Sequence, residues 1–364
     1  MITLARSRFR DKRPEMLLLQ AFEDFCATHS EWKVVNGPIL FSPAKISTRL
    51  YTFLNTTLRP ILGSIRRSGA ILSLNFPYRH YLFGKTFPYF GLSYETRAFW
   101  TYDVWEPGFD TFERLVREAK INLLMLSSFQ ATQHFRRRRI PGCEVHWVPE
   151  SIDPSRYLAR PWSERTVDIL AFGRPHLRYH ARIAAECVRD RINYVFQPNY
   201  PTFQDLAQGL ANAKLCVCFP RSVTNPESAG MVSTLTMRYL EAMASRCLLI
   251  GEPPAEACKL LRYNPVVEVD WSDPVGQIKS LLREADAYRP LIEKNFAEVN
   301  DRFHSRSFIA RVQRLVARRV RKLSKGARSN ALPSPVSSSI EKPGASRRTF
   351  ERKNQYAWRN LRSC

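Results

Sequence analysis

Short apolar runs alternate with amphipathic segments along most of the chain. In the first half, runs that favour β-structure fall at 2–5, 33–41, 70–76, 96–103, 121–127 and 144–148. In the second half, they fall at 167–172, 193–197, 214–219, 247–251 and 265–269. Segments with helical spacing lie between them, for example at 15–28, 128–139 and 177–189. This alternation of strands and helices predicts an α/β protein with two doubly wound domains.

Residues 150–166 are polar and lack a hydrophobic period, so the linker between the domains is expected there. We therefore predict an N-terminal domain over 1–155 and a second domain over 156–304. A long amphipathic helix at 305–325 would close the fold. Residues 326–364 are rich in Ser, Pro, Arg and Lys, and this composition predicts a disordered basic tail.

The second domain contains one stretch, 215–251, that reads as strand, loop, helix and strand. Two strands joined by a helix predict a parallel pair, and ligands bind beyond the carboxyl ends of such strands. The loop at 220–233 lies at that end. Ser233 or Thr234 is predicted to begin the helix, whose N-terminus would favour an anion such as phosphate.

The charge of the chain points to polyanionic partners. The net charge is +23 and the isoelectric point is about 10.0. Nucleic acid, an anionic membrane surface and phosphorylated substrates fit this balance. The sequence has no nucleic-acid-binding motif, so we expect no specific nucleic acid partner.

The start of the chain, the length of its apolar runs and its cysteines predict the cellular compartment. The start of the chain is basic without an apolar core, and no apolar run is long enough to span a membrane. The scattered cysteines read as small buried residues of a reducing environment, with a metal site as the alternative. These features predict a cytoplasmic protein.

Motifs in the second domain resemble those of the group-1 nucleotide-sugar glycosyltransferases. The matching residues are Pro220 at a strand end, the E-x-x-G of 227–230, the E-A-M-A of 241–244, and the pair Gly173–Arg174 after the first strand of the second domain. The resemblance covers roughly residues 95–325. It implies a GT-B fold, in which two Rossmann-like domains face each other across a cleft. The first domain would bind the acceptor and the second the nucleotide sugar.

The resemblance also implies roles for individual residues. Glu241 would accept hydrogen bonds from the ribose, and Glu227 would lie near the transferred sugar. The residues expected to bind the remainder of the donor, chiefly its diphosphate, are Gly173, Arg174, Arg178, Ser233, Thr234 and Arg238. Ordinary surface arginines, a local Arg238–Glu241 ion pair and plain helix capping are the structural alternatives. No D-x-D motif is present, so we expect no metal and no cofactor beyond the donor substrate.

A base for the acceptor hydroxyl is expected from the first domain, where a carboxylate or histidine can take the proton in an inverting enzyme. Asp103 ends a predicted strand and is the first candidate catalytic residue. The alternatives are Glu106, Asp110 and His80.

Two departures from the family pattern concern the loop and the helix. Six residues, MVSTLT at 231–236, separate the E-x-x-G loop from the E-A-M-A helix, so the usual E-x7-E spacing is missing. Arg246 stands where the family has glycine. The chain resembles a divergent branch associated with surface polysaccharides.

The resulting prediction is a glycosyltransferase that moves a sugar from a nucleotide donor to a glycan or lipid-linked acceptor, in contact with the inner face of the membrane through its basic helix. A catalytically inert GT-B assembly or coat protein, and a nucleic-acid-binding protein, are the alternatives.

Overall fold

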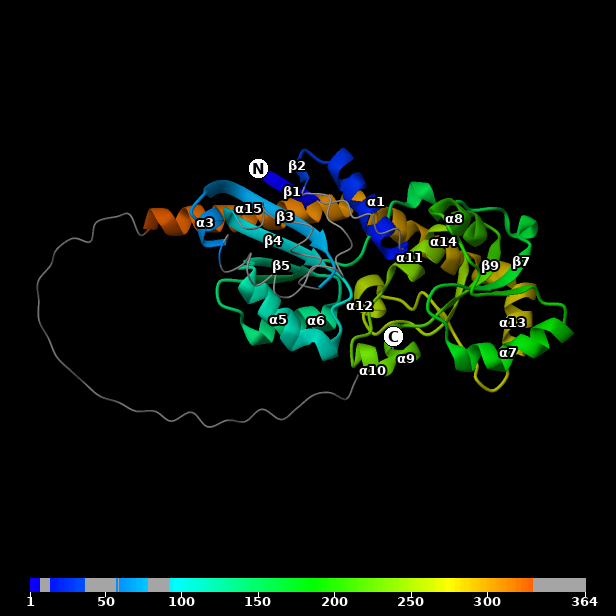
Figure 1. Ribbon diagram of the computed structural model, residues 1–364. Helices are drawn as coiled ribbons and strands as arrows, with labels where there is room; N and C mark the ends of the chain where they lie inside the picture. Colours follow the sequence, from blue (N-terminus) through cyan, green and yellow to red (C-terminus); the bar gives the residue numbers. More distant parts are fainter. Residues whose placement is uncertain (7–13, 37–56, 58, 78–91, 330–364) are drawn as a thin grey trace, which may run out of the picture.

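The structure is a computed structural model that describes residues 1–6, 14–36, 57, 59–77 and 92–329. His80 and the tail from residue 330 onward lie outside these residues. Within them, two separate parallel sheets form the centre of the molecule, and Figure 1 shows them side by side.

The N-terminal sheet has six strands in the order β2-β1-β3-β4-β5-β6, and every neighbouring pair is parallel. Its strands are β1 (Ile2–Arg6), β2 (Lys33–Asn36), β3 (Arg66–Asn75), β4 (Ser93–Thr101), β5 (Leu123–Leu126) and β6 (Glu144–Trp147).

The second sheet has five parallel strands in the order β11-β10-β9-β7-β8. Its strands are β7 (Val167–Ala171), β8 (Tyr194–Phe196), β9 (Ala213–Cys218), β10 (Leu248–Gly251) and β11 (Val267–Glu268). If the strands of each half are numbered along the chain, both sheets contain the order 2-1-3-4-5, and the N-terminal sheet adds a sixth strand. In both sheets the first strand lies between the second and the third, which makes a topological switch point at which ligands bind in such folds.

Helices cover both faces of each sheet (Figure 1). Those of the first half are α1 (Pro14–Thr28), α3 (Arg59–Gly63), α5 (Phe109–Glu118) and α6 (Phe129–Arg138). Those of the second half are α7 (Leu177–Arg189), α8 (Phe203–Ala211), α9 (Arg221–Thr224), α10 (Pro226–Ala229), α11 (Met237–Ala244), α12 (Ala257–Leu261), α13 (Pro274–Arg283) and α14 (Ala285–Asp301). The last helix is α15 (Ser305–Ser329).

The apolar sides of these helices build the cores. On one face of the N-terminal sheet, α1 and α15 pack on residues such as Leu72 and Trp100. On the other face, Phe112 and Phe135 of α5 and α6 pack on Phe99 of β4. In the second half, α8, α11 and α14 cover one face, and α7 and α13 the other.

The chain crosses between the sheets twice, and the two crossings are hydrogen-bonded to each other. The Ile152 N–H donates to the Phe303 carbonyl at 2.9 Å, and the Ser305 N–H donates to the Ile152 carbonyl at 2.8 Å. After this crossing, α15 runs back over the N-terminal sheet (Figure 1). The final helix of the chain therefore ties the second half to the first.

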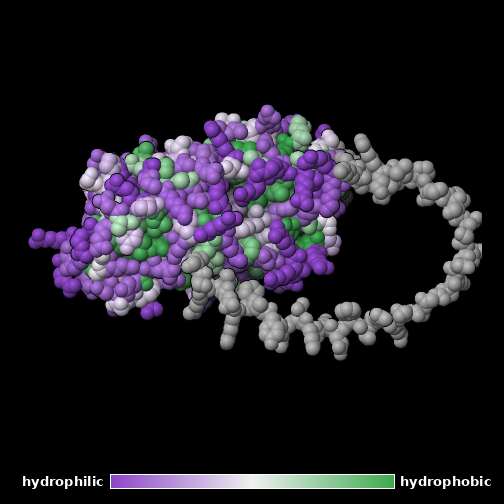
Figure 2. All heavy atoms as spheres, turned by 180° about the vertical axis from the view of Figure 1, so that it is seen from behind, coloured by the Kyte–Doolittle hydropathy of each residue, from purple (hydrophilic) through white to green (hydrophobic). Residues whose placement is uncertain are grey.

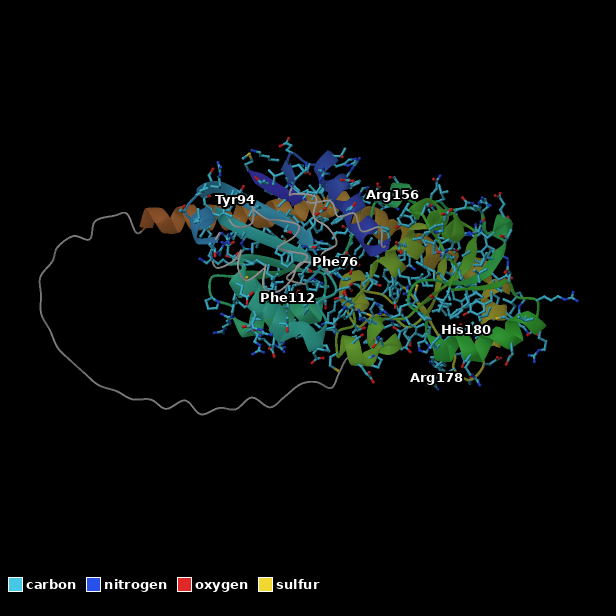
Figure 3. All side chains as sticks on the ribbon, viewed as in Figure 1. Phe76, Tyr94, Phe112, Arg156, Arg178 and His180 are labelled. Carbon is cyan, nitrogen blue, oxygen red and sulfur yellow. The ribbon has the colours of Figure 1, made fainter. Side chains whose placement is uncertain are left out.

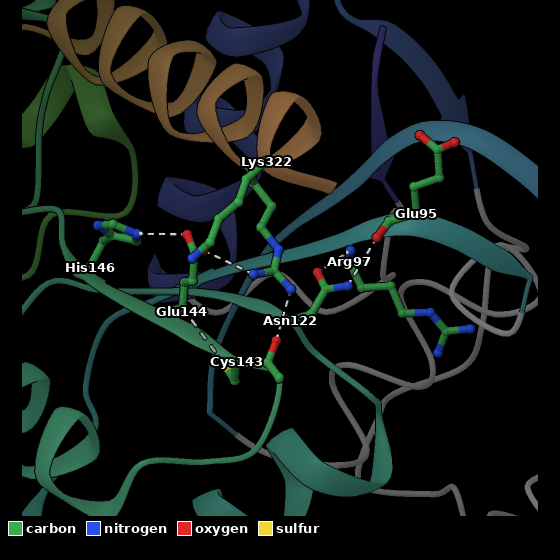
Figure 4. Close-up of polar contacts among 9 residues, drawn as sticks. Glu95, Arg97, Asn122, Cys143, Glu144, His146 and Lys322 are labelled. Atoms are coloured by element: carbon green, nitrogen blue, oxygen red, sulfur yellow. Dashed lines mark hydrogen bonds and ion pairs between the residues drawn. The ribbon is translucent and has the colours of Figure 1, made fainter. Parts of the chain in front are cut away.

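Two basic residues of α15 fix it to the edge strand β6. Arg319 and Lys322 both donate to Oε1 of Glu144 at 2.9 Å, and Figure 4 shows Lys322 reaching this carboxylate from the helix. Burial alone would raise the pKa of Glu144, but the hydrogen bonds from Lys322 and Arg319 lower it to about 2. The helix continues to Ser329, four residues beyond its predicted end at 325.

The α/β fold class predicted from the hydrophobic pattern is confirmed, and each predicted strand is present in the described part of the chain. The stretch 220–233 is not a simple loop, however, since it contains the short helices α9 and α10. Asparagine and proline begin α10: Asn225 caps it by accepting from the Ser228 N–H, and Pro226 is its first residue.

Candidate active site

The switch point of the second sheet lies between β7 and β9, and a basic residue follows each of these strands. Gly173 and Arg174 come directly after β7, and Pro220 and Arg221 come after β9. Because parallel strands end at the same edge of a sheet, the two arginines lie on one side of the molecule. A third arginine, Arg238, comes from the first turn of α11.

The three arginines form one cluster. Burial, together with the neighbouring charges of Arg221 and Arg238, lowers the pKa of Arg174 to about 10, while Asp103 acts in the opposite direction. Arg238 Nη1 donates to the Arg174 carbonyl oxygen at 2.8 Å. Partly buried like charges repel each other, so such a cluster favours a bound anion that would neutralise it.

Gly173 makes room for this cluster. Its φ is +70°, and a Cβ added there would lie 2.6 Å from Nη2 of Arg238. A side chain at this position would therefore have to displace the guanidinium group as well as accept a left-handed backbone.

We expect the substitution Gly173→Ala to weaken binding of inorganic pyrophosphate about tenfold, because it displaces Arg238 from the cluster. The matched control is Gly142→Ala, since Gly142 also has a positive φ, +72°, but has no atom within 4 Å of the added Cβ. Both variants share the backbone strain, and only the first touches the cluster. Calorimetric titration checks this, and equal pyrophosphate affinity in the two variants would contradict it.

Asp103 lies opposite the arginines. It follows β4, which ends two residues earlier than predicted at Thr101, and its φ is +58°. Its charge reaches both Arg174 and Glu150. Asp103, the predicted base from the first half of the chain, is therefore close to Arg174, the residue of the second half that is predicted to bind phosphate.

Glu150 was missed by the sequence reasoning. It is 4% exposed, and burial, followed by the Asp103 charge, raises its pKa well above the usual range. Its Oε2 atom accepts from the N–H of Met237, the first residue of α11, at 2.9 Å. The carboxyl group of Glu150 therefore already accepts a hydrogen bond from an N–H group at the start of α11. No sequence motif marks Glu150, because only the crossing of the chain brings it to this helix.

The other two acidic candidates in this region have structural partners. Asp110 Oδ1 accepts from Arg138 Nη2 at 2.6 Å, which ties α5 to α6. Glu106 Oε2 accepts from the Met231 N–H at 2.6 Å. Of the three carboxylates, Asp103 is the one whose charge acts on Arg174.

Arg221 was also missed, although its position directly after Pro220 could have indicated it. Its Nε donates to Ser228 Oγ at 2.9 Å, and its guanidinium carbon lies 4.7 Å from the centre of the Trp105 ring. Trp105 belongs to the first half of the chain, so this cation–π contact spans the two halves. It holds the charge of Arg221 near Arg174.

Glu241 lies on α11, one turn beyond Arg238, and is 4% exposed. Its Oε1 accepts from the hydroxyl of Tyr157 at 3.1 Å. Burial raises the pKa of Glu241 to about 7, against the lowering effects of Tyr157 and Arg238. Instead of forming an ion pair with Glu241, the Arg238 guanidinium donates to the Arg174 carbonyl.

The prediction that Ser233 or Thr234 begins the helix is wrong. The helix begins at Met237 after Thr236, so neither residue presents an N–H of the first turn. Ser233 Oγ accepts from the Ala255 N–H at 3.0 Å, and Thr234 Oγ1 donates to Glu256 at 2.6 Å. Both hydroxyl groups therefore bond to other residues of the second half.

Arg178, the other arginine predicted to follow this strand end and bind phosphate, has an aromatic neighbour. Arg178 lies on the exposed side of α7, with its guanidinium carbon 4.9 Å from the centre of the Trp271 ring. Figure 3 shows it at the lower edge of the second half, below His180.

The six inserted residues at 231–236, which lengthen the family spacing, include contacts with the first half of the chain. Gln130 of α6 donates to the Met231 carbonyl at 2.8 Å and accepts from the Ser233 N–H at 2.8 Å. Val232 is buried in the core of the N-terminal sheet. The insertion therefore docks the second half on the first. Glu227 is exposed on α10, which packs against the turn Glu106–Gly108.

The described residues contain no group of three histidine, cysteine, aspartate or glutamate side chains that could hold a metal ion. Cys26, Cys143, Cys187, Cys216, Cys218 and Cys247 are free thiols, most of them buried.

No protein-family model and no curated protein matches this chain. Solved structures do match. A UDP-forming α,α-trehalose-phosphate synthase from Burkholderia xenovorans has a TM-score of 0.53 at 12% identity, over 87% of this chain and 98% of that one. A sucrose-phosphate synthase from Thermosynechococcus elongatus has a TM-score of 0.50 at 12% identity, over 89% and 99%.

The chain has the GT-B fold. This agrees with the two parallel sheets of matching order and with the final helix that returns over the first sheet. At this level of identity the likeness concerns the fold.

Proposed function

We propose that this protein is a glycosyltransferase that moves a sugar from a nucleotide-sugar donor to an acceptor hydroxyl. The observation that carries the proposal is the cluster of Arg174, Arg221 and Arg238 at the switch point of the second sheet, with Asp103 of the first half opposite. A diphosphate matches three convergent guanidinium groups in charge and in geometry.

The proposed reaction breaks the bond between the sugar carbon and the diphosphate oxygen and forms a bond from that carbon to the acceptor oxygen. Negative charge grows on the leaving diphosphate, where the arginines stabilise it. Asp103 takes the proton of the acceptor hydroxyl. Glu241 would accept from the ribose, which requires its present bond to Tyr157 to be exchanged or shared.

Uridine diphosphate (UDP) is the first nucleotide to test as the product. The trehalose-phosphate synthase that shares this fold is UDP-forming, as its name states. Among nucleoside diphosphates, UDP is therefore the probe with a structural precedent in this fold.

For the acceptor we propose a glycan or a lipid-linked sugar of surface polysaccharide synthesis, with a peripheral membrane contact made by charge. The apolar side of α15 is buried against the sheet and cannot insert into lipid, while Arg314, Arg318 and Arg321 are exposed. No helix in the described part of the chain is long and apolar enough to cross a membrane. Hydrophilic residues cover most of the face in Figure 2. A basic surface of this kind would attract anionic lipid.

A coupled assay for nucleoside diphosphate release tests the proposal, with UDP-glucose, UDP-galactose, UDP-N-acetylglucosamine and GDP-mannose as donors and water as the default acceptor. We expect Asp103→Asn to lower turnover by about 10²- to 10⁴-fold and to leave UDP affinity nearly unchanged. Asp110→Asn, which removes a carboxylate paired with Arg138, is the control and should keep full turnover.

Two results would count against this function. One is a protein that binds UDP and releases none from any donor, as an inert GT-B relative would. The other is an Asp103→Asn variant as fast as the parent, which would remove Asp103 from the reaction.

A further inference from the structure

A groove of about 340 Å³ lies where α1 meets the crossing between the two halves, and neither the arginine cluster nor Asp103 lines it. Its lining comes from five parts of the fold. These are α1, the first crossing at 151–157, the starts of α8 and α11, and Ser305 at the start of α15. Figure 3 shows Arg156, which lines the groove, at the junction of α1 and α8.

Aromatic rings form the walls of the groove, and each is held by its own packing. Phe22 packs edge-on against Phe308, with the ring centres 4.9 Å apart. Phe25 is stacked on His29. Phe203 meets Tyr157 edge-on at 5.1 Å and carries the Arg156 guanidinium 3.7 Å from its ring centre. The apolar surfaces are therefore preformed rather than created by a ligand.

Two serine residues that line the groove have hydroxyls without a hydrogen-bond partner in the described part of the chain. Ser151 is 5% exposed and Ser305 is 1% exposed, and Oγ of each is buried. A buried hydroxyl without a partner costs free energy, so such groups are rare in folded proteins unless a ligand or a water completes them. Two of them in one groove point to a ligand with hydroxyl groups of its own.

Two carboxylates, one guanidinium and the threonine Thr28 are further polar groups of the lining. Asp24, which is paired with Arg6, and Asp153 are both in the groove, as is Arg156. Asp153 Oδ1 accepts from the Ser155 N–H and hydroxyl. The two carboxylates would repel an anion, and a purely apolar ligand would leave the serine hydroxyls unpaired.

We propose that this groove binds a sugar ring at a site separate from the donor site. The C–H face of a pyranose packs on aromatic rings, and its hydroxyls can pair with the serines and carboxylates. Sugar binding in this groove does not depend on whether the protein catalyses the proposed transfer reaction. Tyr157 is shared between the groove and Glu241, since its ring lines the groove and its hydroxyl bonds the glutamate. A sugar in the groove therefore contacts the residue that positions Glu241.

Saturation-transfer NMR tests the proposal, with methyl α-glucoside, methyl α-mannoside, methyl α-galactoside, methyl N-acetyl-β-glucosaminide and maltose as probes. We expect at least one probe to receive saturation from the protein. Ser151→Ala and Ser305→Ala should each weaken its binding about tenfold without lowering the melting temperature, because the hydroxyl that is removed has no partner in the protein. Ser73→Ala is the matched control, since Ser73 is also buried and unpartnered but lies in β3 outside the groove.

The same titrations separate the groove from the donor site. Saturating UDP and the substitution Arg174→Gln should both leave probe binding in place. Three results would overturn the proposal. In the first, no probe binds. In the second, the serine variants bind the probe as the parent does. In the third, UDP displaces the probe, which would place the sugar in the donor site.

Discussion

Replacement of Glu256 by alanine is expected to lower the free energy of unfolding by about 3–5 kcal/mol. Glu256 is 1% exposed, and burial raises its pKa to about 7. Its Oε1 accepts from Thr234 Oγ1 at 2.6 Å and from the Leu235 N–H at 2.8 Å, and its Oε2 accepts from the Phe129 N–H at 2.7 Å. Alanine would leave all three donors without this partner, and two of them, Thr234 Oγ1 and the Leu235 N–H, are buried.

One of the lost hydrogen bonds, from the Phe129 N–H to Glu256, crosses the interface between the two halves. Phe129 is the first residue of α6, in the first half, whereas Glu256, Thr234 and Leu235 belong to the second. The first N–H groups of a helix have no partner within the helix, so Glu256 supplies one from outside. We therefore expect the variant also to lose the docking of the inserted segment, with faster proteolysis at 230–236.

Urea unfolding followed by circular dichroism measures this effect. Glu164→Ala is the control, because Glu164 is an exposed carboxylate, and it should unfold as the parent does. Glu256→Gln keeps the shape and one acceptor, so its loss should be smaller than that of alanine. An alanine variant with the stability of the parent would show that these bonds do not hold the two halves together.

Replacement of Arg174 by glutamine is expected to weaken UDP binding by about 10- to 100-fold. A hydrogen bond to a charged group contributes about 1.5–3 kcal/mol, and a tenfold change in affinity corresponds to about 1.4 kcal/mol. Arg174 is half-buried between Arg221 and Arg238, where water screens its charge poorly. Glutamine keeps a similar length and a hydrogen-bonding end but removes the charge.

Arg178→Gln is the matched control, because the two arginines are four residues apart and have the same chemistry. Arg178 stacks on Trp271 and lies away from the cluster. We expect its variant to bind UDP within a factor of about two of the parent. If Arg178→Gln lost as much affinity as Arg174→Gln, general surface charge rather than the cluster would be holding the phosphates.

The fold was predictable because buried parallel strands appear in the sequence as short, continuous apolar runs. Runs such as 123–126 and 248–251 are apolar on both sides and are flanked by helical patterns. Arg246 shows that motif spacing was also informative. It stands where the family pattern has glycine and indeed has a left-handed backbone, with φ of +52°. Its ion pair with Glu293 and its contact with the Phe296 ring accompany a conformation that glycine adopts more easily.

The site was only partly predictable. Gly173 and Arg174 follow a strand end, where sheet topology alone places ligand contacts. Arg221 also follows a strand end and was missed, whereas Glu150 and Glu256 have no such mark, because their roles depend on the packing of one half of the chain against the other. The error at Ser233 and Thr234 has the same origin, since a hydroxyl residue before a helix reads as a cap unless the fold uses it elsewhere.

A comparison of UDP with uridine in a calorimetric titration of the unmodified protein tests the central claim most directly. The two ligands share the base and the ribose, so their difference in affinity isolates the diphosphate. The arginine cluster predicts one site at which UDP binds at least about tenfold more tightly than uridine, with an affinity that falls as salt is added. Equal affinities for the two ligands, or no binding of UDP, would contradict the assignment of this cluster as the donor site.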